Sequence, residues 1–231
     1  MKKQTLRTAF LATIPVMAGY LVLGTAFGIL TADKGLSLIW PLAMSLFIYA
    51  GSMQFVAINL LTGGASLVSA ALMTLMVNAR HLFYGVTMLD KYKKAGKEKP
   101  YLIFSLTDET FALVCNGAPK DVSPRLYYFF VSLLNQCYWV IGSVLGSLLG
   151  SAMTFDTSGI DFAMTALFVV IFTEQILTAK SLIPPITGVV CSVCCLLLFK
   201  SERFLIPSML CITAVLLLCG AKEPKKKEES L

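Results

Sequence analysis

Charge is scarce in this 231-residue sequence: 14% of its residues are Asp, Glu, Lys or Arg, and it has one histidine. There is no Walker loop, no His-Glu-x-x-His and no dinucleotide-binding glycine motif, so ATP hydrolysis, zinc-peptidase chemistry and NAD binding lack their usual residues. The seven cysteines include three in one apolar run, Cys191, Cys194 and Cys195, which are expected to pack as small apolar side chains. No cofactor and no metal site is expected.

Hydrocarbon is abundant instead. Hydrophobic residues make up 57% of the sequence, more than a soluble domain can bury, so the composition predicts an integral membrane protein. The apolar runs do not alternate with period 2 as barrel strands do, which favours an all-α fold. The net charge of +6 does not predict nucleic-acid binding, because the lysines flank apolar runs rather than form a stripe.

Seven apolar runs have about the length that a membrane-spanning helix needs. They are 9–31, 38–61, 66–89, 126–150, 161–180, 183–199 and 204–220. The run 101–118 contains Asp108 and Glu109 and is expected to be a re-entrant or interfacial helix, capped by Ser105. Residues 221–231 are expected to form a disordered cytoplasmic tail.

The lysines indicate an orientation. Five of them lie between residues 90 and 100, and more lie in the tail. Placing both groups in the cytoplasm, as the positive-inside rule favours, leaves the N-terminus outside if there are seven spans. The alternative, with the N-terminus inside, requires 101–118 to cross the membrane as well.

An internal repeat is suggested by matching residues. Tyr20, Gly24 and Gly28 correspond to Tyr138, Gly142 and Gly146. With three spans per half, residues 9–89 and 126–199 would be inverted repeats within one transmembrane domain of residues 1–231, followed by an extra span at 204–220. The alternative is chance, because glycines four residues apart are common where helices pack. The same glycine faces could also join two copies of the chain.

Polar or flexible residues interrupt the second and fifth spans at corresponding depths. These candidate substrate-binding residues are Gly51, Ser52 and Gln54, and Thr173, Glu174 and Gln175. Repeat-related interruptions of this kind mark the binding sites of many transporters, and freed backbone amides can bind a carboxylate. Glu174 would be suited to carry a coupling proton. In the alternative interpretation these side chains only bond their neighbours, with Glu174 at the membrane edge.

The third span holds the costliest residue. A charge such as Arg80 costs about 2.5–3.5 kcal/mol at the centre of a membrane helix, so it needs a partner or a polar cavity. Asn78 and His81 share one helix face beside it and are further site candidates. Arg80 either clamps a substrate carboxylate or, as we favour, forms a structural ion pair with Asp108 or Glu109.

Several segments together resemble one family. The run Phe47–Phe55, the run Asn78–Gly85, Thr107–Thr110, and Tyr138-Trp139 with Gly142 and Gly146 resemble the AzlC family, large subunits of bacterial branched-chain amino acid permeases. The resemblance implies export of valine, leucine, isoleucine or a related apolar amino acid such as methionine across the bacterial inner membrane. It also implies a small membrane partner of the AzlD type.

Alternating access driven by the proton motive force is the expected mechanism, since no ATP motif is present. Two other classes stay open. One is a channel-like or assembly subunit without its own substrate site. The other is an intramembrane enzyme that pairs a serine with His81.

Overall fold

The computed structural model describes residues 2–93, 95–152 and 181–220, together with positions 162, 169, 172, 173, 176 and 177. All regular secondary structure in these residues is helical, as the sequence predicts. The chain divides into two units, residues 1–164 and 165–231. Among the described residues, two helices are long and apolar enough to cross a membrane, or three if a bent pair counts as one span. The predicted count of seven is therefore not confirmed.

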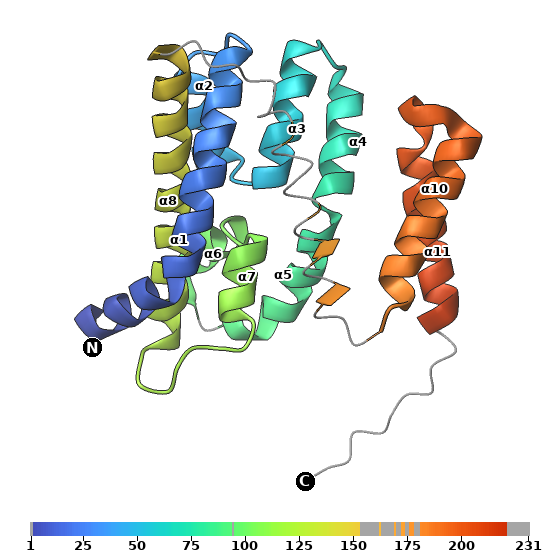
Figure 1. Ribbon diagram of the computed structural model, residues 1–231. Helices are drawn as coiled ribbons and strands as arrows, with labels where there is room; N and C mark the ends of the chain where they lie inside the picture. The colour runs from blue at the N-terminus through green and yellow to red at the C-terminus, as the bar shows by residue number, and fades with distance from the viewer. Residues whose placement is uncertain are drawn as a thin grey trace. The chain divides into compact units, whose positions relative to one another are not determined.

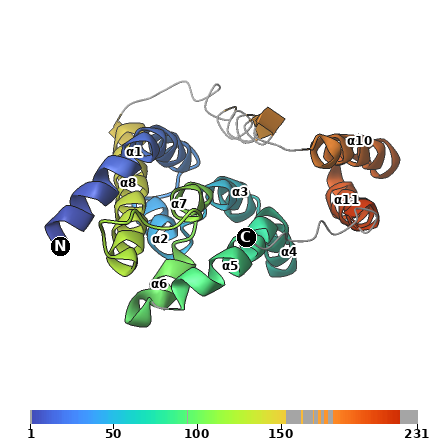
Figure 2. The ribbon, with the colours of Figure 1, turned by 90° about the horizontal axis from the view of Figure 1, so that it is seen from below.

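The two long helices of the first unit, α1 (Lys2–Asp33) and α8 (Pro124–Ala152), pack side by side (Figures 1 and 2). Glycines allow the close approach: a Cβ on Gly24 would lie 3.2 Å from the Cα of Gly142, and one on Gly150 would lie 3.0 Å from the Cα of Ile29. Because residue numbers rise together along the two helices, α1 and α8 run parallel.

This direction bears on the predicted repeat. Three spans per half would place the matching spans 9–31 and 126–150 in opposite directions, whereas α1 and α8 point the same way. The inverted relation of 9–89 to 126–199 is not confirmed, and much of the second segment lies outside the described residues. The glycine faces of α1 and α8 are occupied by each other within the chain.

The predicted span 38–61 is two helices, α2 (Ile39–Phe47) and α3 (Gly51–Thr62), joined at residues 48–50. Both are too short to cross a bilayer of about 30 Å. The chain turns back at this joint, so residues 39–62 form a re-entrant hairpin, here called the first hairpin (Figure 1). The third predicted span follows as α4 (Leu67–Val77) and α5 (Ala79–Tyr92), with a bend of 49° at Asn78.

The run 101–118 also folds back. A 3₁₀ turn (Gly96–Glu98) leads into α6 (Lys99–Phe104), and α7 (Asp108–Val114) follows after three residues. Residues 99–114 form the second hairpin. The cap of α7 is Thr107, whose Oγ1 accepts the Thr110 N–H at 3.3 Å. The predicted cap, Ser105, is wrong: this residue ends α6, and its Oγ donates to the Tyr101 carbonyl at 2.7 Å.

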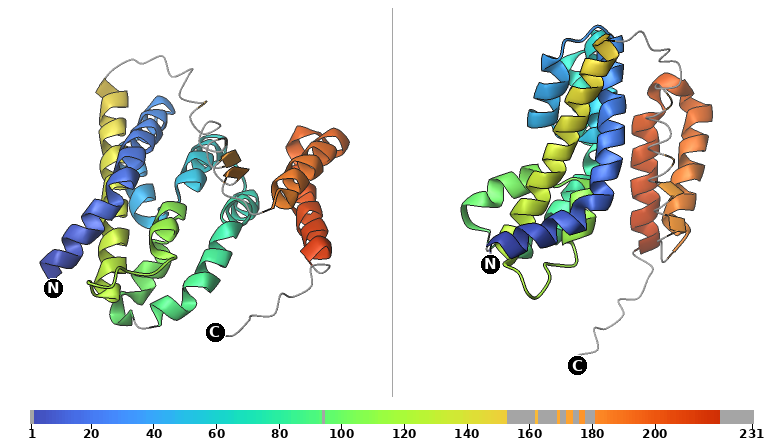
Figure 3. Two further views of the ribbon diagram at one scale, coloured as in Figure 1. Left: turned by 60° about the horizontal axis from the view of Figure 1, so that its bottom comes forward. Right: turned by 60° about the vertical axis from the view of Figure 1, so that its left-hand side comes forward.

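Two separate hydrophobic cores show that the hairpins enter from opposite ends (Figure 3). The first hairpin packs in a core with the C-terminal half of α1, through residues such as Phe27 and Phe55. The second hairpin packs in a core with the N-terminal halves of α1 and α8, through Ala9, Leu102 and Val131. Because α1 and α8 are parallel, these two cores lie at opposite ends of the unit.

The second core also contains Met88, Tyr92 and Ala95, so the lysine-rich loop lies at the same end as the N-terminus. The expectation that they lie on opposite sides is wrong, because 38–61 turns back instead of crossing. This charged end carries Lys2, Lys3, Arg7, Lys91, Lys93, Lys97, Lys99, Lys120 and Arg125. The described loops of the other end, 34–38 and 63–66, carry Lys34 alone. The positive-inside rule then predicts that the charged end faces the cytoplasm.

An exposed ion pair at the charged end joins the start of α8 to the 3₁₀ turn before α6. Arg125 Nε, at the start of α8, donates to Glu98 Oε2 at 2.7 Å, and a second nitrogen of the same guanidinium donates to Oε1 at 2.7 Å. This hydrogen-bonded guanidinium holds the pKa of Glu98 below its ordinary value.

The second unit contains α10 (Ile183–Arg203) and α11 (Leu205–Gly220), which pack together as a helical pair. They correspond to the predicted helices at 183–199 and 204–220. Cys191 and Cys195 are buried, and Cys191 Sγ lies 3.7 Å from Cys211 Sγ.

Candidate functional site

The tip of the first hairpin is a strained turn. Tyr49 adopts a left-handed backbone conformation, with φ of 45°, which is costly for a bulky residue and is found mostly at functional sites. Gly51 starts α3 directly afterwards, and a Cβ there would lie 3.2 Å from the Trp139 ring. The tip is therefore held against α8.

Arg80 joins both hairpins. It lies in the first turn of α5, just after the bend, where its Nη2 donates to Ser52 Oγ at 3.1 Å and to Asp108 Oδ2 at 2.8 Å. Ser52 is in the first turn of α3 and Asp108 starts α7, so one guanidinium contacts both hairpin tips. Its buried Nε has no hydrogen-bond partner among the described residues.

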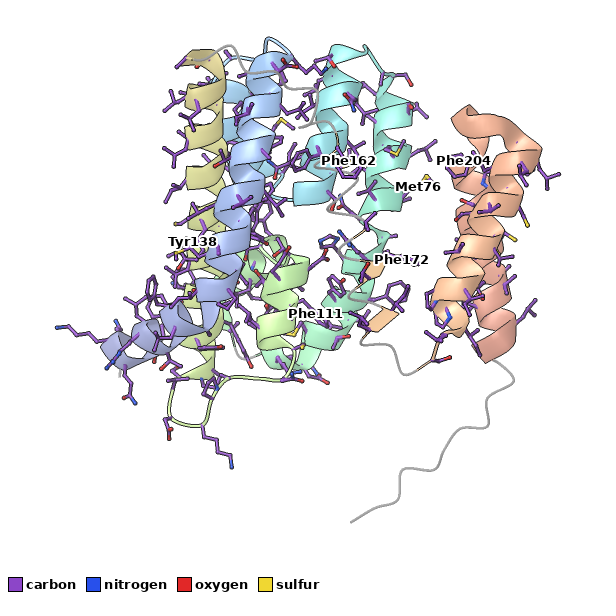
Figure 4. All side chains as sticks on the ribbon, viewed as in Figure 1. Met76, Phe111, Tyr138, Phe162, Phe172 and Phe204 are labelled. Atoms are coloured by element: carbon purple, nitrogen blue, oxygen red, sulfur yellow. The ribbon has the colours of Figure 1, made fainter. Side chains whose placement is uncertain are left out.

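The tip of the second hairpin is a polar cluster. Tyr20 of α1 donates its hydroxyl hydrogen to Glu109 Oε2 at 2.6 Å, and the same hydroxyl lies 2.8 Å from Thr107 Oγ1. Both Asp108 and Glu109 lie in the first turn of α7, where the helix dipole favours negative charge. Phe111 lies on α7 (Figure 4), and its ring stacks on Tyr84 of α5 with 4.3 Å between centroids.

Two adjacent amides of α8 connect these parts. Asn135 Nδ2 donates to Thr110 Oγ1 at 3.0 Å. Gln136 accepts the Tyr101 hydroxyl at 2.8 Å and donates to the Leu46 carbonyl at 3.3 Å, so it contacts both hairpins. Amides that bond across helices in this way stabilise packing inside membranes.

A cavity of about 250 Å³ lies between the first hairpin's tip, α5 and α6. Its polar lining consists of Tyr49, Asn78, His81, Tyr92 and Lys99. Its other lining residues are small or apolar: Ile48, Ala50, Gly85, Leu89, Ile103, Phe104 and Leu106. The volume lies below the usual range for drug-sized ligands and suits a molecule of amino-acid size. Tyr92 and Lys99 belong to the charged end, so the cavity extends from the hairpin tips toward that end.

Helix ends give the cavity one electrostatic pole. The C-terminal ends of α2 and α6 both reach it, through Ile48 and Phe104. Helix C-termini carry partial negative charge and unsatisfied carbonyls, which favour a cation. On another side the cavity meets the junction of α4 and α5, where the two helix dipoles offset each other because α4 ends and α5 begins at Asn78, and where Asn78 and His81 supply polar side chains. The His81 ring is fixed beside Asn78, with Nδ1 3.2 Å from the Asn78 carbonyl.

The structure brings most of the predicted residues of the first unit together. Asn78 and His81 line the cavity, and Arg80 contacts Ser52 and Asp108 beside it. Of the two partners left open for Arg80, the structure shows Asp108, while Glu109 bonds Tyr20.

Other predicted residues lie elsewhere. Gln54 is buried away from the cavity, where it accepts the Trp139 indole N–H at 2.9 Å and donates to Ser45 at 3.2 Å. Thr173 is an exposed residue of the second unit whose hydroxyl donates to the Val169 carbonyl at 2.7 Å. Glu174 and Gln175 lie outside the described residues.

Sequence reasoning missed Tyr49, Tyr92 and Lys99 in the cavity, and Asn135 and Gln136 between the hairpins. The two adjacent amides carried a usable signal, because an Asn-Gln pair inside an apolar run needs bonding partners. The cavity residues carried none, because tyrosines and a loop lysine are ordinary at a membrane interface.

Comparison with known proteins decides the family. The model of the AzlC protein family matches residues 15–153, and the Branched-chain amino acid transport protein AzlC of Bacillus subtilis is 48% identical over 224 residues, covering 96% of this chain and 87% of that protein. The chain belongs to the AzlC family.

Other relatives are named as membrane proteins. An uncharacterized membrane protein of Helicobacter pylori is 45% identical over 213 residues, covering 92% of this chain and 93% of that protein. The Inner membrane protein YgaZ of Escherichia coli is 29% identical over 174 residues, covering 72% and 70%. No solved structure matches this AzlC chain. The matched segment, 15–153, contains both hairpins, Arg80 and the cavity.

Proposed function

We propose that this chain is the transport subunit of an exporter of branched-chain or related apolar amino acids in the bacterial inner membrane. The observation that carries the proposal is the 250 Å³ cavity between interrupted helices, with the polar side chains of Asn78 and His81 on one side, a cation-favouring pole on another and an apolar lining. A zwitterion with an aliphatic side chain needs these three environments at once. The name of the Bacillus subtilis relative supports the same substrate class.

The residues and helix ends around the cavity favour one orientation of the substrate. Its carboxylate faces the start of α5, near Asn78 and His81, with Arg80 behind them. Its ammonium faces the carbonyl ends of α2 and α6. Its aliphatic side chain contacts Leu89 and Ile103. The ion pair of Arg80 with Asp108 is left to hold the hairpin tips rather than to bind the substrate.

The position of the charged end is compatible with export. If that end faces the cytoplasm, the cavity opens toward the cytoplasm in this state, as it does in one state of any alternating-access transporter, and the direction of export is taken from the family resemblance. With 38–61 folded back, α1 and the bent pair α4–α5 cross the membrane in turn and return the chain to the side of its N-terminus. The lysines of the N-terminus and of the 90–100 loop then share one side. We propose that transport proceeds by alternating access, driven by the proton motive force, with a small membrane partner of the AzlD type.

The test is counterflow of labelled leucine in proteoliposomes that contain the chain with and without its small partner. Saturable uptake should be inhibited by valine, isoleucine and methionine, but not by lysine or glutamate. In a separate assay with an imposed proton gradient and no leucine gradient, a protonophore should abolish leucine accumulation. The variant His81→Ala should weaken apparent leucine affinity about tenfold, equivalent to 1.4 kcal/mol. The matched control is Leu82→Ala, whose side chain is 66% exposed on the same helix and should leave affinity unchanged.

Two results would count against the proposal. Flux that rises in proportion to leucine without saturating would indicate a channel-like protein instead. Equal affinity in His81→Ala and Leu82→Ala would remove the cavity as the substrate site, even if transport itself were observed.

A further inference from the structure

The first unit contains a structural repeat that differs from the one the sequence suggested. Three helix boundaries recur at a spacing of 57 residues. The first arm of each hairpin ends at Phe47 and at Phe104, and the second arm begins at Gly51 and at Asp108. The spans that follow the hairpins, α4 and α8, begin at Leu67 and Pro124, also 57 residues apart.

Residues at three equivalent positions agree with this spacing. A serine precedes each span, an asparagine lies in the middle of each span, and a glycine lies further along the same span. These pairs are Ser66 with Ser123, Asn78 with Asn135, and Gly85 with Gly142. Elsewhere the two segments differ strongly, so the helix boundaries rather than the identities carry the repeat.

The two repeats run in opposite directions. Each consists of a hairpin and the span after it, residues 39–92 and 96–152. The hairpins enter from opposite ends, and α8 runs from the end where α5 finishes, because Met88 and Tyr92 of α5 share a core with Tyr127 and Tyr128 of α8. This is the inverted arrangement found in many transporters, where exchanging the conformations of two repeats moves the opening from one side to the other.

The two repeats are not in the same state. The first arm of the first hairpin, α2, is hydrogen-bonded to α8. Ser45 Oγ donates to Ser143 Oγ at 2.9 Å, and Gln136 Nε2 donates to the Leu46 carbonyl at 3.3 Å. The 57-residue spacing relates this pair of helices to α6 and α5. Between α6 and α5, the structure has the cavity, lined by Ile103 on one side and Leu89 on the other. One helix seam is closed where its counterpart is open.

We propose that the α2–α8 seam is the closed gate of this state, and that it opens as α6 closes on α5. The inference rests on the proposed transport function, for which it supplies the moving part. Ser45 and Ser143 mark the gate: both are fully buried, and Gln54 ties Ser45 to the Trp139 ring behind it. Opening the seam exposes these serines to the end opposite the charged end.

The test is a reversible cross-link. In a variant without its seven native cysteines, Ser45→Cys and Ser143→Cys are combined, because their hydroxyl oxygens already lie 2.9 Å apart. Oxidation should lower the rate of leucine counterflow at least tenfold, and reduction should restore it. Labelled leucine should still bind the oxidised protein from the charged end. Each single cysteine variant, oxidised in the same way, should transport normally.

A second measurement does not depend on cross-linking. Ser143→Cys alone should react with a membrane-impermeant thiol reagent from the side opposite the charged end, and faster during leucine transport. Three results would each overturn the gate. The oxidised double variant could transport as fast as the same protein in its reduced form. The two cysteines could fail to cross-link, or Ser143→Cys could fail to react during transport. Absence of counterflow in the cysteine-free parent, when the native chain also lacks it, would instead overturn the proposed function.

Discussion

Removing Arg80 should loosen the junction of the two hairpins, and the size of the effect follows from its contacts. Its guanidinium lies 2.8 Å from the Asp108 carboxylate, and each side chain is 25% exposed. At an effective dielectric constant of about 20, the attraction at this distance is about 6 kcal/mol before desolvation is subtracted. Contacting pairs usually show a net coupling of about 0.5–3 kcal/mol. We expect a value of about 1–3 kcal/mol, because the pair is mostly shielded.

A double-mutant cycle measures this coupling. Arg80→Met, Asp108→Asn and the double variant would be unfolded reversibly in mixed micelles, with the fluorescence of the two tryptophans, Trp40 and Trp139, as the probe. Each single variant should lose about 1.5–3 kcal/mol, because it leaves a charged or polar partner unsatisfied. The double variant should lose less than the sum of the two.

The exposed pair Lys93–Asp90 is the matched control, since its side chains are 70% and 87% exposed. A cycle on this pair should give no measurable coupling. If the cycle on Arg80 gave no more than this control, the guanidinium would not be holding the hairpin tips, and the account of the junction would be refuted.

Three further predictions concern packing, pH and the cavity. Gly28→Ala should destabilise the protein by about 1–3 kcal/mol, because its Cβ would overlap the backbone of α8, whereas Gly19→Ala on the same helix meets nothing and should be neutral or stabilising in the same unfolding assay. Glu98, whose pKa is lowered by its arginine partner, should stabilise the protein above its unfolded-state pKa of about 4.3. That contribution is lost as pH falls through the lowered pKa, so thermal unfolding of Glu98→Gln should show a weaker acid dependence. Ile103→Trp should fill the cavity and abolish leucine binding, measured by equilibrium dialysis, while Leu82→Trp on the exposed face of α5 should bind normally.

Each of these has a contrary outcome. Equal stability of the two glycine variants would mean that α1 and α8 are not in close contact. An unchanged acid dependence of unfolding in Glu98→Gln would mean that the ion pair of Glu98 with Arg125 does not form. Leucine binding retained by Ile103→Trp would place the substrate elsewhere.

The sequence predicted the helical membrane class because apolar run length is a direct signal, and it located the break at Gly51 because glycine and serine rarely interrupt a span without reason. It could not give the direction of 38–61. Hydropathy reports how much apolar chain is present, and a broken hairpin of this length has as much as a straight span. The error in direction then placed the N-terminus on the wrong side relative to the lysine loop.

The candidate site was predicted in part for a related reason. The cost of a charge in the membrane identified Arg80 and limited its partners to Asp108 or Glu109. Choosing between these two required the orientation of α7, in which the Tyr20 hydroxyl donates a hydrogen bond to Glu109. The cavity required three segments to meet, and no local pattern in any one of them predicts such a meeting.

The order in which the chain is made gives the contacts between the first hairpin and α8 a further consequence. Ser45 and Gln54 bond Ser143 and Trp139, which lie about 90 residues later in the chain. At synthesis rates of about 5–20 residues per second, the first hairpin waits roughly 5–20 s in the membrane before those partners are made. During that interval the polar side chains of the hairpin lack these hydrogen-bond partners, which makes their insertion into lipid unfavourable. The nascent chain must therefore keep the hairpin in the insertion machinery or at the membrane surface until α8 arrives, so a ribosome stalled before residue 124 should leave residues 39–62 accessible to protease.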